Sequence, residues 1–304
     1  MVYSAGNEYI DQPVASAFPT GNGMMPLVTP ANTAAGLYGF VQIETEEQFE
    51  DGAYYTPLNP SDPAIADLDF SDLKGTLIAV AAVGPDGKIA SYSNRCGAAA
   101  EWCLAAPGGE IDGKTNGVFS TFPMRTYEYE AGTSMAAPHV TGSAAVLREA
   151  FPYMNARQVI ETILTTAKDV GPAEIYGQGM LDLGTAVKGP MAFRYDGVFD
   201  VDTQGYVSEW SNPISGPAGL RKRGAGTLIL SGDNSYAGAT NVTGGTLAVT
   251  GRRHGLAGAC GSSGRNRGEN EGRGQLHAAV RFRLRADDRR YRGGQDRGRR
   301  QRHH

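Results

Sequence analysis

The stretch EAGTSMAAPHVTGSAAV, residues 130–146, is the most informative part of the sequence. A Gly-Thr-Ser turn precedes a run of small apolar residues, which predicts a tightly packed helix that begins near Gly132 and carries Ser134 in its first turn. Backbone N–H groups in a first turn are unpaired and lie at the positive end of the helix dipole, so the N–H of Ser134 can hold an oxyanion beside it. Ser134 is therefore a candidate nucleophile, and a serine that only caps a buried helix is the equal alternative.

Two neighbours of Ser134 have expected roles in the backbone. Gly132 is expected to allow the tight approach at this site, because it has no Cβ atom. Pro138 is expected to lie early enough in the helix that its missing N–H costs little.

Apolar strand-like runs and amphipathic helical runs alternate over residues 1–190, a pattern typical of an α/β fold. The clearest strand is LIAVAAV at 77–83, which is apolar throughout and therefore suits a parallel sheet covered on both faces. A second helix is predicted over 156–167, with Asn155 as its N-cap and Gln158 three residues later. Its apolar residues recur at helical spacing, so one face must pack against a sheet or another helix.

Other segments carry weaker signals. Residues 11–75 are rich in Pro, Gly, Asp and Thr, with an acidic patch, ETEEQFED, at 44–51, and we expect long surface loops with one strand. The sequence has no apolar run of the roughly 20 residues that a transmembrane helix needs, and no signal peptide or membrane anchor is recognisable.

The string GTSMAAPHVTG closely resembles the nucleophile signature of the subtilisin-like serine proteases. Further matches follow the chain order of that family: SAGNE at 4–8, LIAVAAV at 77–83, ASYSN at 90–94, LAAPG at 104–108 and YGQGMLDLGTA at 176–186. The resemblance implies a partial subtilisin-like parallel sheet flanked by helices, and a serine endopeptidase that cleaves a polypeptide substrate through an acyl-enzyme on Ser134. It implies no cofactor for catalysis and assigns no calcium ligands.

The same resemblance assigns the side-chain amide of Asn7 to the oxyanion hole, although Asn7 taken alone reads as a turn residue. A serine nucleophile also needs a base and a carboxylate that orients the base. In the family order both precede Asn7, so the triad Asp and His are absent from this chain. Because His139 lies five residues after Ser134, it is turned away on the helix and is expected to be structural. The chain is therefore expected to be a fragment that is inactive alone.

Beyond residue 190, short Thr, Val, Leu and Ile stretches are separated by Gly and Asn. The triplet at 226–228, Gly-Thr-Leu, returns 19 residues later at 245–247. This short period predicts stacked coils of a β-solenoid, and a lone hairpin is the alternative. The segment 210–251 resembles the passenger-associated repeat of bacterial autotransporters. That resemblance implies a secreted or cell-surface protease whose solenoid leads to an outer-membrane barrel; the alternative is a non-catalytic β-solenoid protein that retains a decayed protease module.

Cys96 and Cys103 are close enough in sequence to close a small disulfide loop, which would fit an oxidising compartment. Two buried free thiols are the alternative. The placement of the pair between the ASYSN and LAAPG segments is also similar to the autotransporter subgroup. Cys260 stands alone near the end of the chain.

The last segment, 252–304, differs in composition from the rest. It carries 15 Arg and no Lys against 5 acidic residues, whereas residues 1–251 carry 13 basic and 27 acidic residues. Its Arg, Gly and Ala are residues of GC-rich codons, which favours a frameshifted, disordered tail without the strands of a barrel. A nucleic-acid-binding tail is disfavoured because aromatic platforms and repeated RGG spacing are missing. The expected units are a peptidase portion at 1–190, a linker and β-repeat at 191–251, and this tail.

Overall fold

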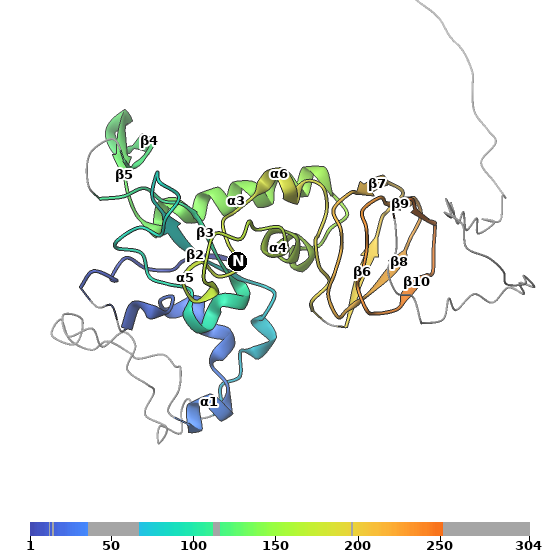
Figure 1. Cartoon of the computed structure of the whole chain (residues 1–304), viewed down its shortest axis with the longest axis horizontal. Coiled ribbons are helices and arrows are strands. Elements are labelled where there is room, and N and C mark those ends of the chain that lie inside the picture. Colours follow the sequence, from blue (N-terminus) through green and yellow to red (C-terminus); the bar gives the residue numbers. More distant parts are fainter. Residues whose placement is uncertain (12, 14, 36–66, 112–115, 196, 252–304) are drawn as a thin grey trace, which may run out of the picture.

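The computed structural model describes residues 1–251 except 12, 14, 36–66, 112–115 and 196. Figure 1 shows an α/β part, which holds the N-terminus, followed by a part built from stacked strands. The acidic patch at 44–51 and the basic tail at 252–304 lie outside the described residues.

A three-stranded parallel sheet forms the centre of the α/β part. Its order is β1 (Val2–Ser4), β2 (Ile78–Val83) and β3 (Cys103–Pro107). Every residue of β2 is buried, because it pairs on both edges and is covered on both faces. The prediction of a doubly covered strand at 77–83 is confirmed.

Helix α3 (Thr133–Ala150) packs across all three strands of this sheet. Its buried positions recur at helical spacing, and most of them are small: Thr133, Ala136, Val140, Ser143 and Leu147. Small side chains bring the helix axis close to the sheet. The N-terminal turn of α3 is thereby fixed directly beside the carboxyl end of β1.

Helix α4 (Ala156–Thr165) packs against α3 and begins as predicted. The Asn155 side chain accepts a hydrogen bond from the Gln158 N–H at 2.9 Å, and the Gln158 side chain accepts one from the Asn155 N–H at 2.8 Å. This reciprocal capping box satisfies two backbone donors that the helix itself leaves unpaired.

Short helices and one hairpin complete the α/β part. The hairpin pairs β4 (Val118–Phe122) with β5 (Thr126–Glu130) through the turn η6 (Pro123–Arg125). The short helices are η1 (Ala15–Ala17), η2 (Gly21–Leu27), α1 (Pro30–Ala34), η4 (Ser71–Leu73), η5 (Gly97–Trp102), α5 (Ala173–Tyr176) and α6 (Leu183–Ala186). The expectation of loops over 11–75 is therefore wrong where that segment is described, because 3-10 turns this short leave no periodic apolar pattern.

The disulfide between Cys96 and Cys103 is formed, with an S–S distance of 1.97 Å. It joins the start of η5 to the start of β3. Within the described ranges, no helix combines the length and the apolar character that a bilayer crossing needs.

The strands after residue 197 form two parallel three-stranded sheets. One has the order β10 (Thr240–Val242), β8 (Gly219–Arg223), β6 (Val198–Asp202), and the other β11 (Thr246–Val249), β9 (Thr227–Leu230), β7 (Val207–Trp210). Each successive pair of strands stacks on the previous pair, and Thr246 and Leu247 lie opposite Thr227 and Leu228. The repeated Gly-Thr-Leu triplets are thus in register in adjacent coils. The solenoid prediction is confirmed, and the hairpin alternative is wrong because the pairing is parallel.

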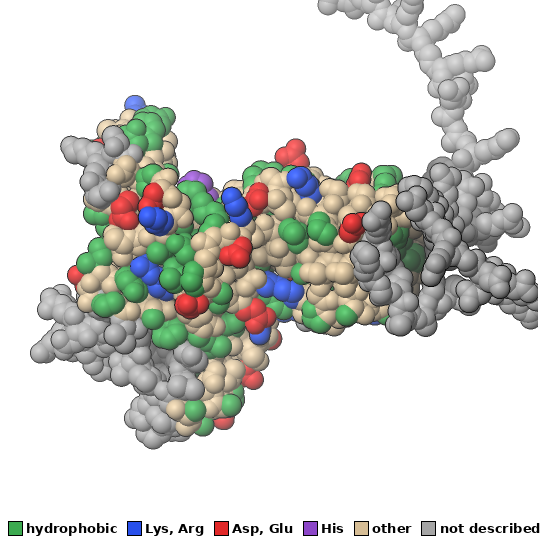
Figure 2. All heavy atoms as spheres, viewed as in Figure 1, with side chains coloured by type: hydrophobic (Ala, Val, Ile, Leu, Met, Phe, Trp, Pro, Cys, Tyr) green, Lys and Arg blue, Asp and Glu red, His purple; other side chains and the backbone are tan. Residues whose placement is uncertain are grey.

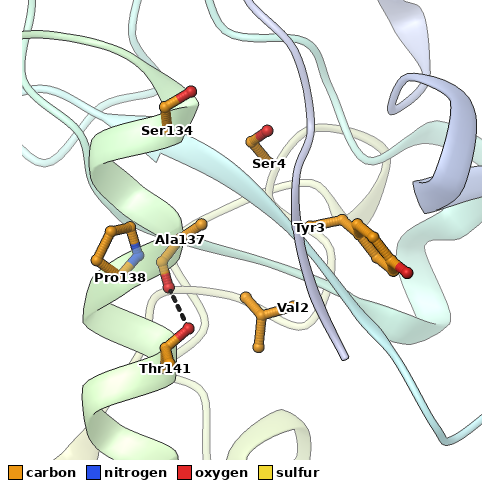
Figure 3. Close-up of a pocket in the computed structure, with 7 residues that line it drawn as sticks. All are labelled: Val2, Tyr3, Ser4, Ser134, Ala137, Pro138 and Thr141. Carbon is orange, nitrogen blue, oxygen red and sulfur yellow. Dashed lines mark hydrogen bonds between the residues drawn. The ribbon is translucent and has the colours of Figure 1, made fainter.

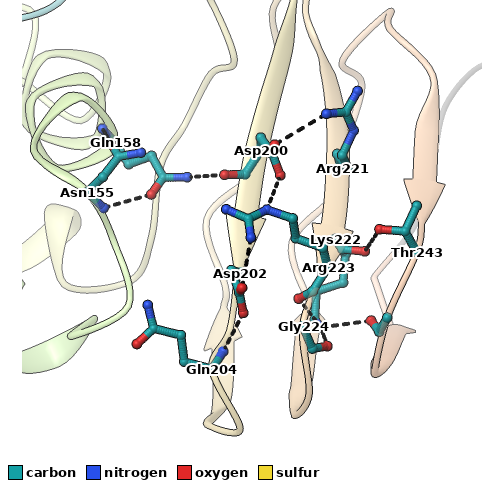
Figure 4. Close-up of polar contacts among 11 residues, drawn as sticks. Asn155, Gln158, Asp200, Asp202, Gln204, Arg221, Lys222, Arg223, Gly224 and Thr243 are labelled. Atoms are coloured by element: carbon teal, nitrogen blue, oxygen red, sulfur yellow. Dashed lines mark hydrogen bonds and ion pairs between the residues drawn. The ribbon is translucent and has the colours of Figure 1, made fainter.

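Helix α4 and the loop after it cover the first coil of the solenoid. The Gln158 side chain donates to the backbone carbonyl of Asp200 at 2.7 Å (Figure 4), and Glu161 accepts from the backbone N–H of Arg194. Tyr153 donates to Ser208 at 2.7 Å, which extends the polar junction to the second strand of the coil. Buried aromatic rings of Phe193, Phe199, Trp210 and Tyr236 pack together inside the coils.

Candidate active site

Ser134 is the second residue of α3, and its side chain is exposed at the N-terminal end of the helix. Its N–H belongs to the first turn, which has no helical acceptor. Thr133, the residue before it, is completely buried and holds this end of the helix in place. The structure thus presents the candidate nucleophile to solvent on a rigid support.

Thr133 ties the segment after β1 to the start of α3. Its Oγ1 accepts a hydrogen bond from the Gly6 N–H at 3.1 Å. Its N–H and its hydroxyl both donate to the Asn7 Oδ1, each at 2.9 Å. These bonds join residues that lie more than 120 positions apart in the sequence.

Asn7 is consequently oriented with its amide nitrogen free to donate. Because Oδ1 accepts from Thr133 twice, the Nδ2 group points elsewhere, and Asn7 is exposed. A Cβ atom built on Gly132 would lie 3.6 Å from Asn7 Nδ2 and 3.7 Å from Ser134 N. The two nitrogen atoms therefore lie within 4 Å of one point beside Ser134.

Two hollows meet at Ser134. One lies between α3 and β1, and is lined by Val2, Tyr3 and Ser4 from the strand and by Ser134, Ala137, Pro138 and Thr141 from the helix (Figure 3). Among the described residues, β1 pairs only with β2, so no strand lies along its other edge.

The second hollow, which we call the hairpin groove, runs from Ser134 along the β4–β5 hairpin. Its lining includes Ser120, Glu128 and Glu130 from the hairpin and Met135 and His139 from α3. An extended polypeptide could pass along either hollow and approach the Ser134 hydroxyl.

His139 is the one histidine within the described part of the chain. Its Nδ1 lies 2.9 Å from the Met135 carbonyl of its own helix, and its side chain is exposed. In that same part, no hydrogen bond joins an imidazole to Ser134 Oγ, and no three His, Cys, Asp or Glu side chains gather as a metal site needs. His139 nevertheless lines the hairpin groove together with Ser134, so the expectation that it is structural stays a prediction.

The two neighbours of Ser134 differ in outcome. A Cβ atom on Gly132 would contact the protein at no less than 3.4 Å, but it would lie within 4 Å of both Asn7 Nδ2 and Ser134 N, so the glycine leaves that point open. The expectation for Pro138 is wrong, because Pro138 is the sixth residue of α3 and its missing N–H leaves the carbonyl of Ser134 without its helical donor.

Gly108, at the end of the LAAPG segment, permits a close approach between segments of the chain. A Cβ atom there would lie 2.5 Å from the Ala82 Cβ and 2.7 Å from the Gly132 carbonyl oxygen. The Gly108 carbonyl in turn accepts from the Gly132 N–H at 2.9 Å. In the sequence, the signal for this role is the place of Gly108 in the LAAPG motif.

Comparison with known proteins identifies two families that this chain matches. Residues 1–179 match the subtilase family, and residues 220–249 match the passenger-associated transport repeat. Solved structures that align with part of the chain include a protease from Pseudoalteromonas arctica, at 32% identity over 37% of this chain and 35% of that one, with a TM-score of 0.32.

Several known proteins are similar over the same region. Serotype-specific antigen 1 of Mannheimia haemolytica is 38% identical over 192 residues, which is 60% of this chain and 20% of that protein. An extracellular serine protease of Serratia marcescens is 34% identical over 60% of this chain and 22% of its own length. The autotransporter lipoprotein NalP of Neisseria meningitidis is 41% identical over 52% of this chain and 14% of its own length.

The chain spans about a fifth or less of the length of these relatives. The subtilase match nevertheless extends over more than half of the chain and includes both Asn7 and Ser134. A passenger-associated repeat follows the subtilase match. The chain therefore belongs to the subtilase family and, within it, to the subtilisin-like proteases of the autotransporter type.

Proposed function

We propose that this chain is the nucleophile-bearing part of a secreted serine endopeptidase. The observation that carries the proposal is that the Asn7 Nδ2 and the Ser134 backbone nitrogen both lie within 4 Å of one point beside the exposed Ser134 side chain. The Ser134 hydroxyl attacks the carbonyl carbon of a peptide bond, and these two donors hold the oxyanion that forms. Removal of one such donor typically costs about 3 kcal/mol of transition-state stabilisation.

The base and the orienting carboxylate come from residues outside this chain in the proposed enzyme. The base has to reach the Ser134 hydroxyl, take its proton during attack and return it to the leaving amine. Without these groups the serine hydroxyl is a weak nucleophile at neutral pH. We therefore expect the chain by itself to hydrolyse no peptide.

Secretion by the autotransporter route is part of the same proposal. It is supported by the passenger-associated repeat at 220–249 and by relatives that are named as extracellular or autotransporter proteins. The Cys96–Cys103 disulfide fits an oxidising compartment. The polypeptide substrate and the outer membrane are the partners that this route implies.

The test is labelling with a fluorophosphonate probe in the full-length gene product. We expect Ser134→Ala to abolish labelling and casein hydrolysis together. Ser211→Ala is the matched control, because Ser211 is exposed after β7, outside both hollows, and should leave labelling unchanged. Labelling that persists in Ser134→Ala would overturn the assignment. A full-length protein that folds and is never labelled would favour the alternative, a non-catalytic surface protein with a decayed protease module.

A further inference from the structure

The β4–β5 hairpin exposes an unusual amount of aromatic surface. Phe119, Tyr127 and Tyr129 are 57%, 63% and 47% exposed, and we call these three rings the aromatic face. The hairpin projects from the α/β part at the end remote from the coils (Figure 1), and hydrophobic side chains gather on it in the space-filling view (Figure 2). Contiguous apolar patches at the surface of a soluble domain mark places of interaction.

The aromatic face is already ordered. The ring centroids of Phe119 and Tyr127 are 5.6 Å apart, and those of Phe119 and Tyr129 are 4.9 Å apart. Antiparallel pairing places Phe119 opposite Tyr129 and Thr121 opposite Tyr127, so all three rings project from the same side of the hairpin. Because the three rings already pack against one another, binding of a ligand to them costs little side-chain entropy.

Both sides of the hairpin contribute to the groove that contains Ser134. On the side opposite the aromatic face, Ser120 pairs with Glu128, and both line the hairpin groove. Phe119 of the aromatic face lines the same groove. Strand β5 ends at Glu130, four residues before Ser134, and the Gly132 N–H is bonded to the Gly108 carbonyl. The aromatic face is therefore connected rigidly to the candidate nucleophile.

We propose that the aromatic face is an accessory binding surface for the polypeptide substrate. It would hold an extended segment that carries aromatic or other apolar side chains, while a neighbouring part of the same substrate follows the hairpin groove to Ser134. This inference rests on the proposed protease function. It goes beyond that function because it assigns a preference in the substrate to residues that take no part in the chemistry.

The chemistry of the hairpin favours a polypeptide as the occupant. Within the described residues each strand of the hairpin pairs only with the other, so an extended chain can add to an outer edge while its side chains stack on the rings. A membrane surface is less suited, because Glu128 and Glu130 give the hairpin two negative charges against one positive charge on Arg125. Binding of lipid is kept as an outcome of the test.

The experiment measures binding without cleavage. The full-length protein with Ser134→Ala is titrated into a fluorescein-labelled 12-residue peptide that contains two Phe residues, and into the same peptide with both replaced by Ser. The aromatic peptide should bind more tightly. Adding Tyr127→Ser and Tyr129→Ser should weaken its binding about tenfold, whereas Tyr127→Phe and Tyr129→Phe should preserve it. Tyr206→Ser, at a ring that is 49% exposed in the solenoid, is the matched control and should leave Kd unchanged.

Two further measurements separate the possible failures. The first uses the protein that keeps Ser134 and carries both Tyr127→Ser and Tyr129→Ser, which we call the double Ser variant. This variant should keep its fluorophosphonate labelling rate and its kcat/KM for a short tripeptide ester. Its activity should fall only on long polypeptide substrates. Equal Kd values for both peptides, or an equal loss on short and long substrates, would overturn the accessory surface while Ser134 stays assigned. If the double Ser variant does not fold, Tyr127→Ser alone is measured. The second measurement is sedimentation of the protein with phosphatidylglycerol vesicles. If the double Ser variant no longer sediments with the vesicles but still binds the peptide, the proposal is overturned in favour of a membrane contact.

Discussion

At the scale of single residues, Lys222 places a charged ammonium group in the interior of the solenoid, where it needs hydrogen-bond acceptors. It is completely buried in β8, and its ammonium group donates to the carbonyls of Arg223, Gly224 and Gly244 at 2.9, 3.0 and 3.0 Å (Figure 4). All three donors of the ammonium group are used, and Gly244 belongs to the next coil. Lys222 therefore joins two successive coils.

We predict that Lys222→Met destabilises the folded state by about 2 kcal/mol. Methionine keeps much of the length and volume, but leaves three carbonyls without this donor in a buried site. Urea unfolding followed by far-UV circular dichroism measures the loss. Lys88→Met, at a lysine whose side chain is 80% exposed, is the control and should change the free energy of unfolding by less than about 0.5 kcal/mol. Equal effects of the two substitutions would contradict the role of Lys222.

Tyr92 gives the fold a sensitivity to alkaline pH. It is 1% exposed, and the single proton of its hydroxyl is shared between the carbonyl oxygens of Gly108 and Gly109, at 2.9 and 3.0 Å, directly beside the start of α3. Burial raises the pKa of the Tyr92 phenol well above its usual range, and the negative charge of Glu110 adds to the effect. Burial likewise raises the pKa of Tyr195 to about 12.

The sign of the pH dependence follows from these raised pKa values. Below pH 10 the phenols are neutral in the folded and in the unfolded chain, so their stabilising effect is fully present. Above pH 10 the unfolded chain loses protons that the folded chain keeps, and the free energy of unfolding falls. Tyr92→Phe should make the decline between pH 9 and pH 11 shallower, at a cost of about 1 kcal/mol at neutral pH. The exposed Tyr129→Phe should leave the slope unchanged, and an unchanged slope in Tyr92→Phe would refute the prediction.

At the scale of secondary structure elements, the start of α4 offers a direct measurement of a predicted cap. Asn155→Ala removes the side chain that accepts from the Gln158 N–H, and should cost about 1 kcal/mol of stability. Asn155→Asp should retain most of it, because a carboxylate can accept the same bond. Asn241→Ala, at an exposed position in β10, serves as the control in the same urea titrations. A cost below 0.3 kcal/mol for Asn155→Ala would show that tertiary packing alone sets the helix start.

The same helix shows where prediction from sequence succeeds and where it stops. Local rules sufficed for its cap and for the apolar face, because neighbours in the chain supply both. The burial of Gln158 and Glu161 was not predictable, since their partners are backbone groups of Asp200 and Arg194 in another part of the fold. A polar side chain on a helix is expected to face water unless something far along the chain covers it.

The candidate site divides in the same way. Motifs were enough to propose roles for Ser134 and Asn7. The hydrogen bonds of Thr133 to Asn7 and Gly6 could not be predicted, because they depend on how two distant segments meet. The β4–β5 hairpin carried no recognised signal. Its aromatic side chains, at Phe119 and Tyr129, lie at the surface, which reverses the usual expectation that such residues form the core.

At the scale of the whole molecule, α4 makes the α/β part and the solenoid one structural unit. Both contribute to a continuous buried cluster, and polar bonds from Tyr153, Gln158 and Glu161 cross the junction. The end of a solenoid exposes unpaired apolar side chains unless another element covers it. Here the peptidase part supplies that cover.

We therefore predict a single unfolding transition for both parts. The chain has two tryptophans, Trp102 in the α/β part and Trp210 in the first coil, so each part has its own fluorescent reporter. In Trp102→Phe, the fluorescence of Trp210 and the far-UV circular dichroism signal should give the same urea midpoint. In Trp210→Phe, the fluorescence of Trp102 should likewise coincide with the dichroism signal. Separated midpoints in both variants would show that the parts unfold independently.

The regular pairing of the coils also bears on how such a molecule can change over generations. Paired positions in successive coils are offset by 19 to 21 residues, and the differences are absorbed in the turns while the strands stay aligned. Duplication or deletion of one such unit in the gene would lengthen or shorten the stack by one strand spacing, about 4.8 Å, without turning any apolar side chain outward. The number of coils thus sets the length of the solenoid in fixed steps, so natural variants can differ in that length while the peptidase part stays the same.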